Sequence, residues 1–102
     1  MAFHVEWTEA AWSDLEEVAD YIARDSRYYA AAFVQEVRDA ARSLSRMARR
    51  GRVVPEFDDP GIRELLVGRY RLICRLAGES VHIVGLVHCA RDLGELWRPE
   101  QG

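Results

Sequence analysis

Three arginines stand close together in the segment RYRLICR, where charged and apolar residues alternate. Because successive side chains of a β-strand point to opposite faces, we expect Arg69, Arg71 and Arg75 on one face of a strand. A guanidinium stays charged at neutral pH and binds a carboxylate or a phosphate through paired hydrogen bonds. His88 lies on the next expected strand, and histidine is a residue type that can exchange protons in catalysis. The arginines therefore indicate a surface suited to an anion, such as the carboxylates of a partner protein.

Each of these side chains also has a structural interpretation that the sequence leaves open. In that interpretation Arg71 pairs with an acid such as Glu64 on the neighbouring strand. Arg91 and Asp92 form a local turn or ion pair, and His88 is a hydrogen-bonded residue at the end of a strand. The alternation alone does not decide between these roles and an anion site.

The element that positions the arginines is a β-meander over about residues 62–90. Residues 70–76 alternate between apolar and basic side chains, whereas residues 81–87 are apolar on both sides and are therefore expected in the centre of the sheet. Gly68 and the Ala77-Gly78-Glu79 run mark tight turns between three strands. The first strand of the chain, within residues 2–7, joins this sheet at an edge that the sequence does not identify.

A helical hairpin over about residues 9–50 is expected to cover the apolar face of the meander. Thr8 is a suitable N-cap for a first helix over residues 9–24, whose apolar stripe includes Trp12 and Leu15. Ser26 begins a second helix that we expect to reach about Arg50, with Gly51 as its left-handed C-terminal residue. The fold class is therefore α+β with the order β-α-α-β-β-β, and the arginine-bearing face of the sheet is left uncovered.

Length and composition describe one domain over residues 1–102, with 49% hydrophobic and 30% charged residues. No apolar run is long enough to span a membrane, and no signal peptide is visible at the N-terminus. Cys74 and Cys89 are too few for a disulfide framework, so we expect reduced thiols and a cytoplasmic location. No second Cys/His pair accompanies His88 and Cys89, so neither a metal site nor a cofactor is expected.

The distribution of charge is more informative than the net charge of −3. Residues 1–40 contain nine acids and three arginines, and residues 41–102 contain eleven arginines and eight acids. An overall acidic protein is not expected to bind nucleic acid by itself, because such binding scales with net cationic groups. Four arginines of the second helix share one face, which is either a solvated surface or a strip for an acidic partner: Arg38, Arg42, Arg46 and Arg49.

The element order and several motifs together resemble the RelE/ParE superfamily of type II toxin–antitoxin toxins. The resemblance covers nearly the whole chain, from the first strand to about Trp97. Its motifs are, in chain order, Pro55-Glu56, Ile62-Arg63-Glu64-Leu65, Tyr70-Arg71-Leu72-Ile73 and His88-Cys89-Ala90-Arg91-Asp92. No single motif is diagnostic, but their order and spacing are specific.

The superfamily contains two kinds of toxin, and the resemblance implies different roles for the same residues in each. RelE-like members are ribosome-dependent mRNA endoribonucleases, in which Arg71 and Arg91 would stabilise phosphate and His88 or Glu64 would move protons. This chain lacks the paired lysines and the late tyrosine of that group, and its net charge is negative. ParE-like members inhibit DNA gyrase by protein–protein contact, and these departures favour that branch.

We therefore predict a ParE-like, non-enzymatic toxin that binds DNA gyrase and is neutralised by a cognate antitoxin, a small DNA-binding protein with an extended tail. A RelE-like nuclease is the first alternative, and a degenerate module that only binds antitoxin is the second. The predicted partner-binding residues are Arg69, Arg71, Arg75, Arg91, Leu96 and Trp97.

Overall fold

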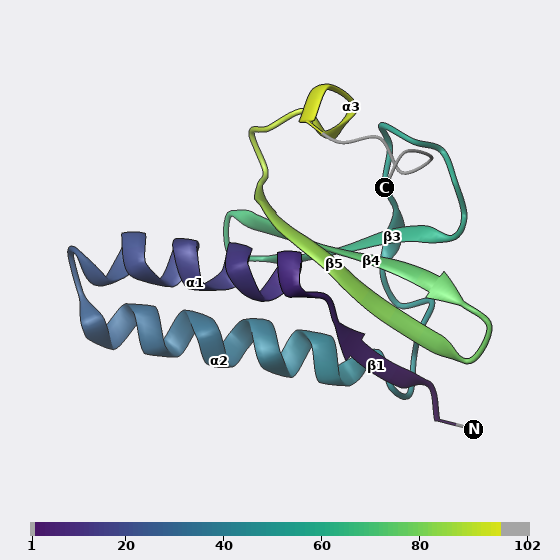
Figure 1. The fold of residues 1–102 in the computed structure, drawn as a ribbon, viewed down its shortest axis with the longest axis horizontal. Coiled ribbons are helices and arrows are strands. Elements are labelled where there is room, and N and C mark those ends of the chain that lie inside the picture. Colours follow the sequence, from purple (N-terminus) through teal and green to yellow (C-terminus); the bar gives the residue numbers. More distant parts are fainter. Residues whose placement is uncertain (1, 97–102) are drawn as a thin grey trace.

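The computed structural model describes residues 2–96, which form five strands and three helices (Figure 1). The chain begins with strand β1 and continues into two long helices, which lie side by side beneath the sheet. Four further strands and a short helix follow. The elements are β1 His4–Trp7, α1 Glu9–Ala23, α2 Arg27–Ser43, β2 Arg52–Val53, β3 Ile62–Val67, β4 Tyr70–Ala77, β5 Ser80–His88 and α3 Leu93–Leu96.

The strands form one sheet in the order β1-β5-β4-β3-β2. Strands β3, β4 and β5 are antiparallel neighbours, which confirms the predicted meander. Its last strand is an interior strand between β1 and β4, and β4 is the middle strand of the sheet. Gly68 and Gly78 join them with φ angles of 57° and 60°, a backbone conformation that glycine adopts without a steric penalty. Strand β1 pairs in parallel with β5, so the first strand of the chain joins the sheet at the edge beside β5, which the sequence did not identify.

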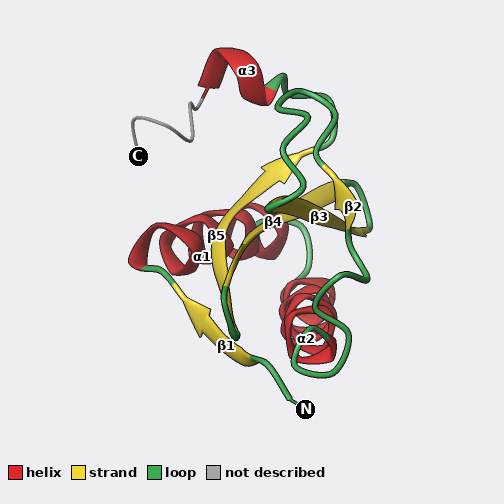
Figure 2. Cartoon of the chain, turned by 90° about the vertical axis from the view of Figure 1, so that its right-hand side faces the viewer, coloured by secondary structure: helices red, strands yellow, loops and turns green. Residues whose placement is uncertain are grey.

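The helical hairpin covers one face of the sheet, as the sequence predicted (Figure 2). The Thr8 hydroxyl accepts a hydrogen bond from the N–H of Ala11 at 3.1 Å, and the Ser26 hydroxyl accepts one from the N–H of Tyr29 at 3.2 Å. These caps satisfy donors that the helix itself leaves unpaired. The main core lies between helices and strands and includes the buried side chains Leu15, Val37, Leu44, Leu72 and Ile83.

The predicted end of the second helix is wrong, because α2 ends at Ser43 rather than near Arg50. The N–H of Leu44 donates to the carbonyl of Ala41, three residues earlier, which ends the α-helical pattern. Tight turns follow, and the side chains of Leu44 and Ala48 are buried in the core. Gly51 is not a left-handed helix cap. A Cβ atom there would lie 2.8 Å from the carbonyl oxygen of Glu64, so glycine permits close approach to β3. The following two residues form β2, which pairs with β3.

The prediction that the chain leaves the second face of the sheet uncovered is also wrong. A smaller hydrophobic cluster lies there, formed by Ile62 and Ile73 from the strands together with Val54 and Leu93 from the segments on either side of the meander. All four are buried, and Phe57 packs against them. The turn after β2 and the start of α3 therefore cover part of this face.

No described helix is long and apolar enough to cross a membrane.

The two cysteines are expected to react very differently in the native protein. Cys74 is buried within the core, and this burial raises the pKa of its thiol to about 11, whereas Cys89 is exposed. Because the thiolate is the reactive species, a chromogenic disulfide reagent at about pH 8 should titrate Cys89 alone. Both thiols should react in denaturant. Rapid reaction of both in the native protein would contradict the buried position of Cys74.

Candidate functional site

The guanidinium of Arg71 is buried and ion-paired rather than exposed on a column of arginines. Its residue exposure is 5%, and its Nη1 atom lies 3.0 Å from Oε1 of Glu64 on β3. The carboxylate of Glu56, in the turn after β2, accepts two more hydrogen bonds from Nη1 and Nη2, at 2.9 and 2.6 Å. The predicted exposed position of Arg71 is therefore wrong, and the alternative pairing with Glu64 is confirmed.

This cluster connects five segments of the chain. Arg52 on β2 donates from Nε to the second oxygen of Glu64, whose side chain is fully buried. Arg71 also donates to the backbone carbonyl of Arg91 at 2.8 Å, and Glu56 accepts the N–H of Leu93 at 3.1 Å. The segment after β5 is thus held against the sheet through charge-assisted hydrogen bonds. We call these four side chains, Arg52, Glu56, Glu64 and Arg71, the arginine–glutamate cluster.

The electrostatics of the cluster follow from its geometry. The hydrogen bonds from Arg71 lower the pKa of Glu56 to about 2, and burial opposes this effect. The Glu56 carboxylate in turn raises the pKa of Arg71 above its ordinary value. Two arginines and two glutamates compensate each other in charge. Arg71 is therefore paired with two carboxylates through its Nη atoms, whereas its buried Nε has no hydrogen-bond partner among the described residues. Both oxygens of Glu64 accept hydrogen bonds from arginines.

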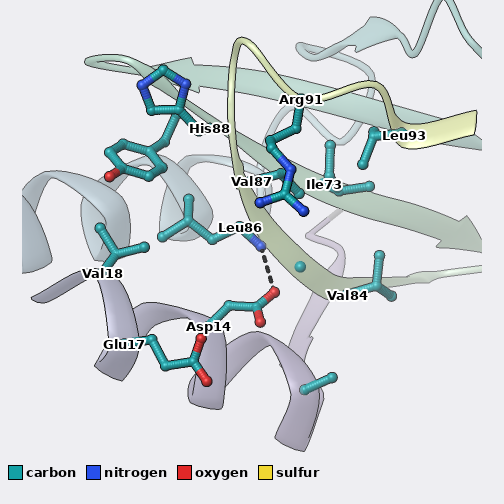
Figure 3. A pocket seen from close by; sticks show the side chains of 13 residues that line it. Asp14, Glu17, Val18, Ile73, Val84, Leu86, Val87, His88, Arg91 and Leu93 are labelled. Atoms are coloured by element: carbon teal, nitrogen blue, oxygen red, sulfur yellow. Dashed lines mark hydrogen bonds between the residues drawn. The ribbon is translucent and has the colours of Figure 1, made fainter. Parts of the chain in front are cut away.

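A separate cleft of about 480 Å³ lies between α1 and the second half of β5 (Figure 3). Strand β1 ends at Trp7, opposite Ile83, so it does not pair with the later residues of β5. The N–H of Leu86 donates instead to the carboxylate of Asp14 on α1, at 3.0 Å. Burial raises the pKa of this aspartic acid. The guanidinium of Arg91 extends over the cleft, facing Asp14 and Glu17 on α1.

His88 stands at the rim of this cleft in a hydrogen-bonded arrangement. Its Nδ1 atom accepts the N–H of Ala90 at 3.1 Å, and its ring packs edge-on against Tyr70 with the centroids 5.2 Å apart. The interpretation of His88 as a hydrogen-bonded strand-end residue is confirmed. The residues considered for RNA cleavage are thus divided between two places. Arg71 and Glu64 lie in the arginine–glutamate cluster, whereas the side chains of His88 and Arg91 line the cleft.

The structure places the other predicted contact residues as follows. Arg69 is exposed in the β3–β4 turn, Arg75 is half-buried on β4, and Leu96 is the last residue of α3. Trp97 lies outside the described residues. The partner-binding role of this group stays a prediction. No group of three potential metal ligands occurs within residues 2–96.

Sequence reasoning missed two acids that matter to the geometry. Glu56 was noted only as part of a motif, and its role in binding Arg71 depends on a turn that no local pattern reveals. Asp14 lies on α1, and it accepts the N–H of Leu86 because β1 ends opposite Ile83 and does not reach Leu86. A signal for Glu56 was present in the proline before it, which favours an ordered turn.

A sequence model of one protein family matches residues 5–93, and that family is described as the ParE toxin of the type II toxin–antitoxin system parDE. The chain belongs to the ParE toxin family. The match includes the helical hairpin, the meander and the segment that carries Arg91. The ParE assignment therefore rests on nearly all of the described fold. Among curated proteins, no significant sequence match was found.

Solved structures agree with the ParE assignment at the level of the fold. The chromosomal ParDE system from P. aeruginosa superposes with a TM-score of 0.70 at 23% identity, over 85% of this chain and 96% of that one. The RelBE2 toxin–antitoxin complex from Mycobacterium tuberculosis gives a TM-score of 0.58 at 26% identity, over 86% of this chain and 99% of that one. A YoeB/ParE toxin from Agrobacterium tumefaciens gives a TM-score of 0.59 at 18% identity, over 83% of this chain and 96% of that one. The predicted superfamily and fold class are thus confirmed.

Proposed function

We propose that this ParE-family toxin inhibits DNA gyrase by protein–protein contact and is neutralised by an antitoxin encoded beside it. The observation that carries the proposal is the arginine–glutamate cluster. The resemblance to the nuclease branch implies that Arg71 would bind phosphate there, yet here two carboxylates of the chain itself pair with its guanidinium. The residue best placed for RNA chemistry is therefore engaged in holding the fold together.

RNA cleavage would require this cluster to open. A phosphate reaching Arg71 would displace Glu56 and Glu64, and the buried side chain of Glu64 would lose a paired charge. Glu64 would then keep only the pair with the exposed Arg52, and the full loss of a buried charge's partner costs about 3–5 kcal/mol in measured cases, which sets an upper bound here. Glu64 cannot act as a base without giving up an arginine partner. This cost favours inhibition by binding over catalysis.

The antitoxin part of the proposal draws on the structural relatives. The P. aeruginosa and M. tuberculosis structures are described as a ParDE system and a RelBE2 toxin–antitoxin complex. We infer that this chain has a cognate partner of the same general kind, a small DNA-binding protein with an extended tail. A tail that folds on binding can follow a large part of a toxin's surface.

The direct test measures gyrase supercoiling of relaxed plasmid with increasing amounts of the purified protein. Dose-dependent inhibition is expected, and addition of the neighbouring gene's product should restore supercoiling. The control is a ribosome-containing translation reaction, in which mRNA should remain intact. Active gyrase at micromolar excess of the protein would overturn the proposal. Translation-dependent mRNA cleavage that Arg71→Ala and His88→Ala abolish would establish the nuclease instead.

A further inference from the structure

Two tryptophans form a surface feature that the proposed function does not use. The rings of Trp7 on β1 and Trp12 on α1 stack with their centroids 4.5 Å apart and their planes 23° apart. The sequence placed Trp12 on the buried stripe of its helix, but the structure leaves it 40% exposed. A large exposed aromatic side chain on a rigid support is a common centre of a binding surface.

Arginines from α2 complete this surface. A groove of about 230 Å³ is lined by Trp7 and Trp12 on one side and by Arg38 and Arg42 on the other. Arg38 has no ion-pair partner among the described residues, and Arg42 contacts only the exposed Asp39 at 3.2 Å. Such an exposed pair contributes little stability and is easily exchanged for another carboxylate. These are the first two members of the arginine strip that the sequence suggested for an acidic partner.

The groove also borders an unpaired strand edge. The N–H groups of His4 and Thr8 point toward β5, because they donate to the carbonyls of Glu79 and Ile83 at 2.9 and 3.0 Å. Alternation along the strand then turns the backbone groups of Val5 and Trp7 to the opposite side. In the part of the chain that the structure describes, no strand pairs with that side of β1 (Figure 2). Just before the strand, the N–H of Phe3 donates to the carbonyl of Ser45 at 2.6 Å, so the open stretch of the edge is Val5 to Trp7. An open edge of this kind is a template for an added strand.

We propose that this groove binds an extended acidic segment of the cognate antitoxin, which adds a strand to the outer edge of β1. The segment would place an apolar side chain against Trp12 and carboxylates against Arg38 and Arg42. This inference deepens the proposed function and depends on it. It locates the antitoxin contact on the edge beside the helical hairpin, rather than on the arginine-bearing face of the sheet.

Charge and backbone geometry favour an acidic peptide in this groove over a nucleic acid or a second copy of the chain. An unpaired strand edge offers N–H and C=O groups in the spacing of another polypeptide, which a nucleic acid does not match. A second copy of the chain, paired isologously through β1, would bring a second set of Arg38 and Arg42 to the same interface. An acidic peptide meets neither obstacle, because its carboxylates compensate both arginines.

The test measures the affinity of the antitoxin, the product of the neighbouring gene, by titration calorimetry at two salt concentrations. We expect the double variant Arg38→Glu, Arg42→Glu to bind at least about tenfold more weakly, with a smaller salt dependence. The matched control is Arg24→Glu, Arg27→Glu, which makes the same charge change at the far end of the helical hairpin. Its affinity should stay within about threefold of the unmodified protein, since it is distant from the groove.

A backbone substitution separates strand addition from charge. Val5→Pro removes an N–H that points away from β5 and leaves the bonds from His4 and Thr8 intact. Proline is tolerated in an edge strand when its missing N–H faces outward, so the protein should fold, as a thermal melt would show. Binding of the antitoxin should nevertheless weaken about tenfold, since the added strand loses a hydrogen bond and meets the proline ring. In the unmodified complex, hydrogen exchange at Val5 and Trp7 should slow.

The possible outcomes distinguish this inference from the proposed function. Full affinity in both the charge-reversal and the Val5→Pro variants, with unchanged exchange at Val5 and Trp7, would overturn the groove assignment and leave the toxin–antitoxin proposal standing. Failure of the unmodified protein to bind the antitoxin would overturn both. A dimer in sedimentation experiments that Val5→Pro abolishes would assign the edge to a second copy of the chain and also overturn the inference.

Discussion

Replacing Arg71 with alanine is expected to lower the free energy of unfolding by about 3–5 kcal/mol. The substitution leaves the fully buried carboxylate of Glu64 with only Arg52, which is 61% exposed, and removes the main partner of Glu56. It also frees the carbonyl of Arg91, so the segment leading into α3 loses an attachment to the sheet. Urea denaturation at neutral pH measures the change directly.

The matched control is Arg69→Ala, two residues earlier in the β3–β4 turn. Arg69 is exposed and its side chain has no ion-pair partner within the described residues, so the loss of stability should stay below about 0.5 kcal/mol. Equal, small effects for Arg69→Ala and Arg71→Ala would mean that the arginine–glutamate cluster does not form in solution. Arg71 would then again be a candidate for binding phosphate.

Acid is expected to destabilise the protein through Glu56. The pKa of this carboxyl is about 2 in the folded protein, below its ordinary value of 4.5, so folding favours the ionised form. Its contribution is fully present above about pH 5 and is lost as the pH falls through 4.5 toward 2. The shift corresponds to at most about 3 kcal/mol, since one pKa unit is worth about 1.4 kcal/mol.

The Glu56→Gln variant isolates this contribution. It should be less stable than the unmodified protein at pH 7, and the difference between the two should shrink as the pH falls toward 2. The raised pKa of Asp14 affects both proteins alike and cancels in the comparison. The measurement is urea denaturation over a series of pH values. A constant difference between the two proteins at every pH would contradict the low pKa of Glu56.

The elements of this fold could be predicted from the sequence where local rules act alone. Alternation over residues 70–76 and the glycines at 68 and 78 define the meander, because strand period and left-handed turns are local properties. The caps at Thr8 and Ser26 likewise depend on side chains within one turn of the helix. The apolar stripes of the two helices and the apolar face of the meander then indicated that the helical hairpin covers one face of the sheet.

The end of α2 and the covering of the second face were not predictable in the same way. Ala41, Leu44 and Ala48 keep a helical spacing, so the apolar pattern continues although the backbone turns after Ser43. The residue at which α2 ends depends on where the core lies, which is a tertiary property. Local propensity is a weak guide when tertiary packing opposes it.

The environment of Arg71 shows the same limit at the candidate site. Strand alternation places its side chain on the face opposite the helices but says nothing about what covers that face. Glu64 was a foreseeable partner because it lies on the adjacent strand. Glu56 is 15 residues away in sequence, and only the turn after β2 brings its carboxylate to the guanidinium. An arginine that suggested an anion site therefore has a structural role.

We propose above that this toxin acts by binding gyrase and not by cutting RNA. The most direct measurement of this proposal is the accumulation of linear, gyrase-linked plasmid DNA when purified gyrase, ATP and supercoiled plasmid are mixed with the protein. Cleaved DNA is expected to increase with the amount of protein and to disappear when antitoxin is added. Plasmid that stays intact with the protein in excess over gyrase, under conditions where a known gyrase poison linearises it, would contradict the claim.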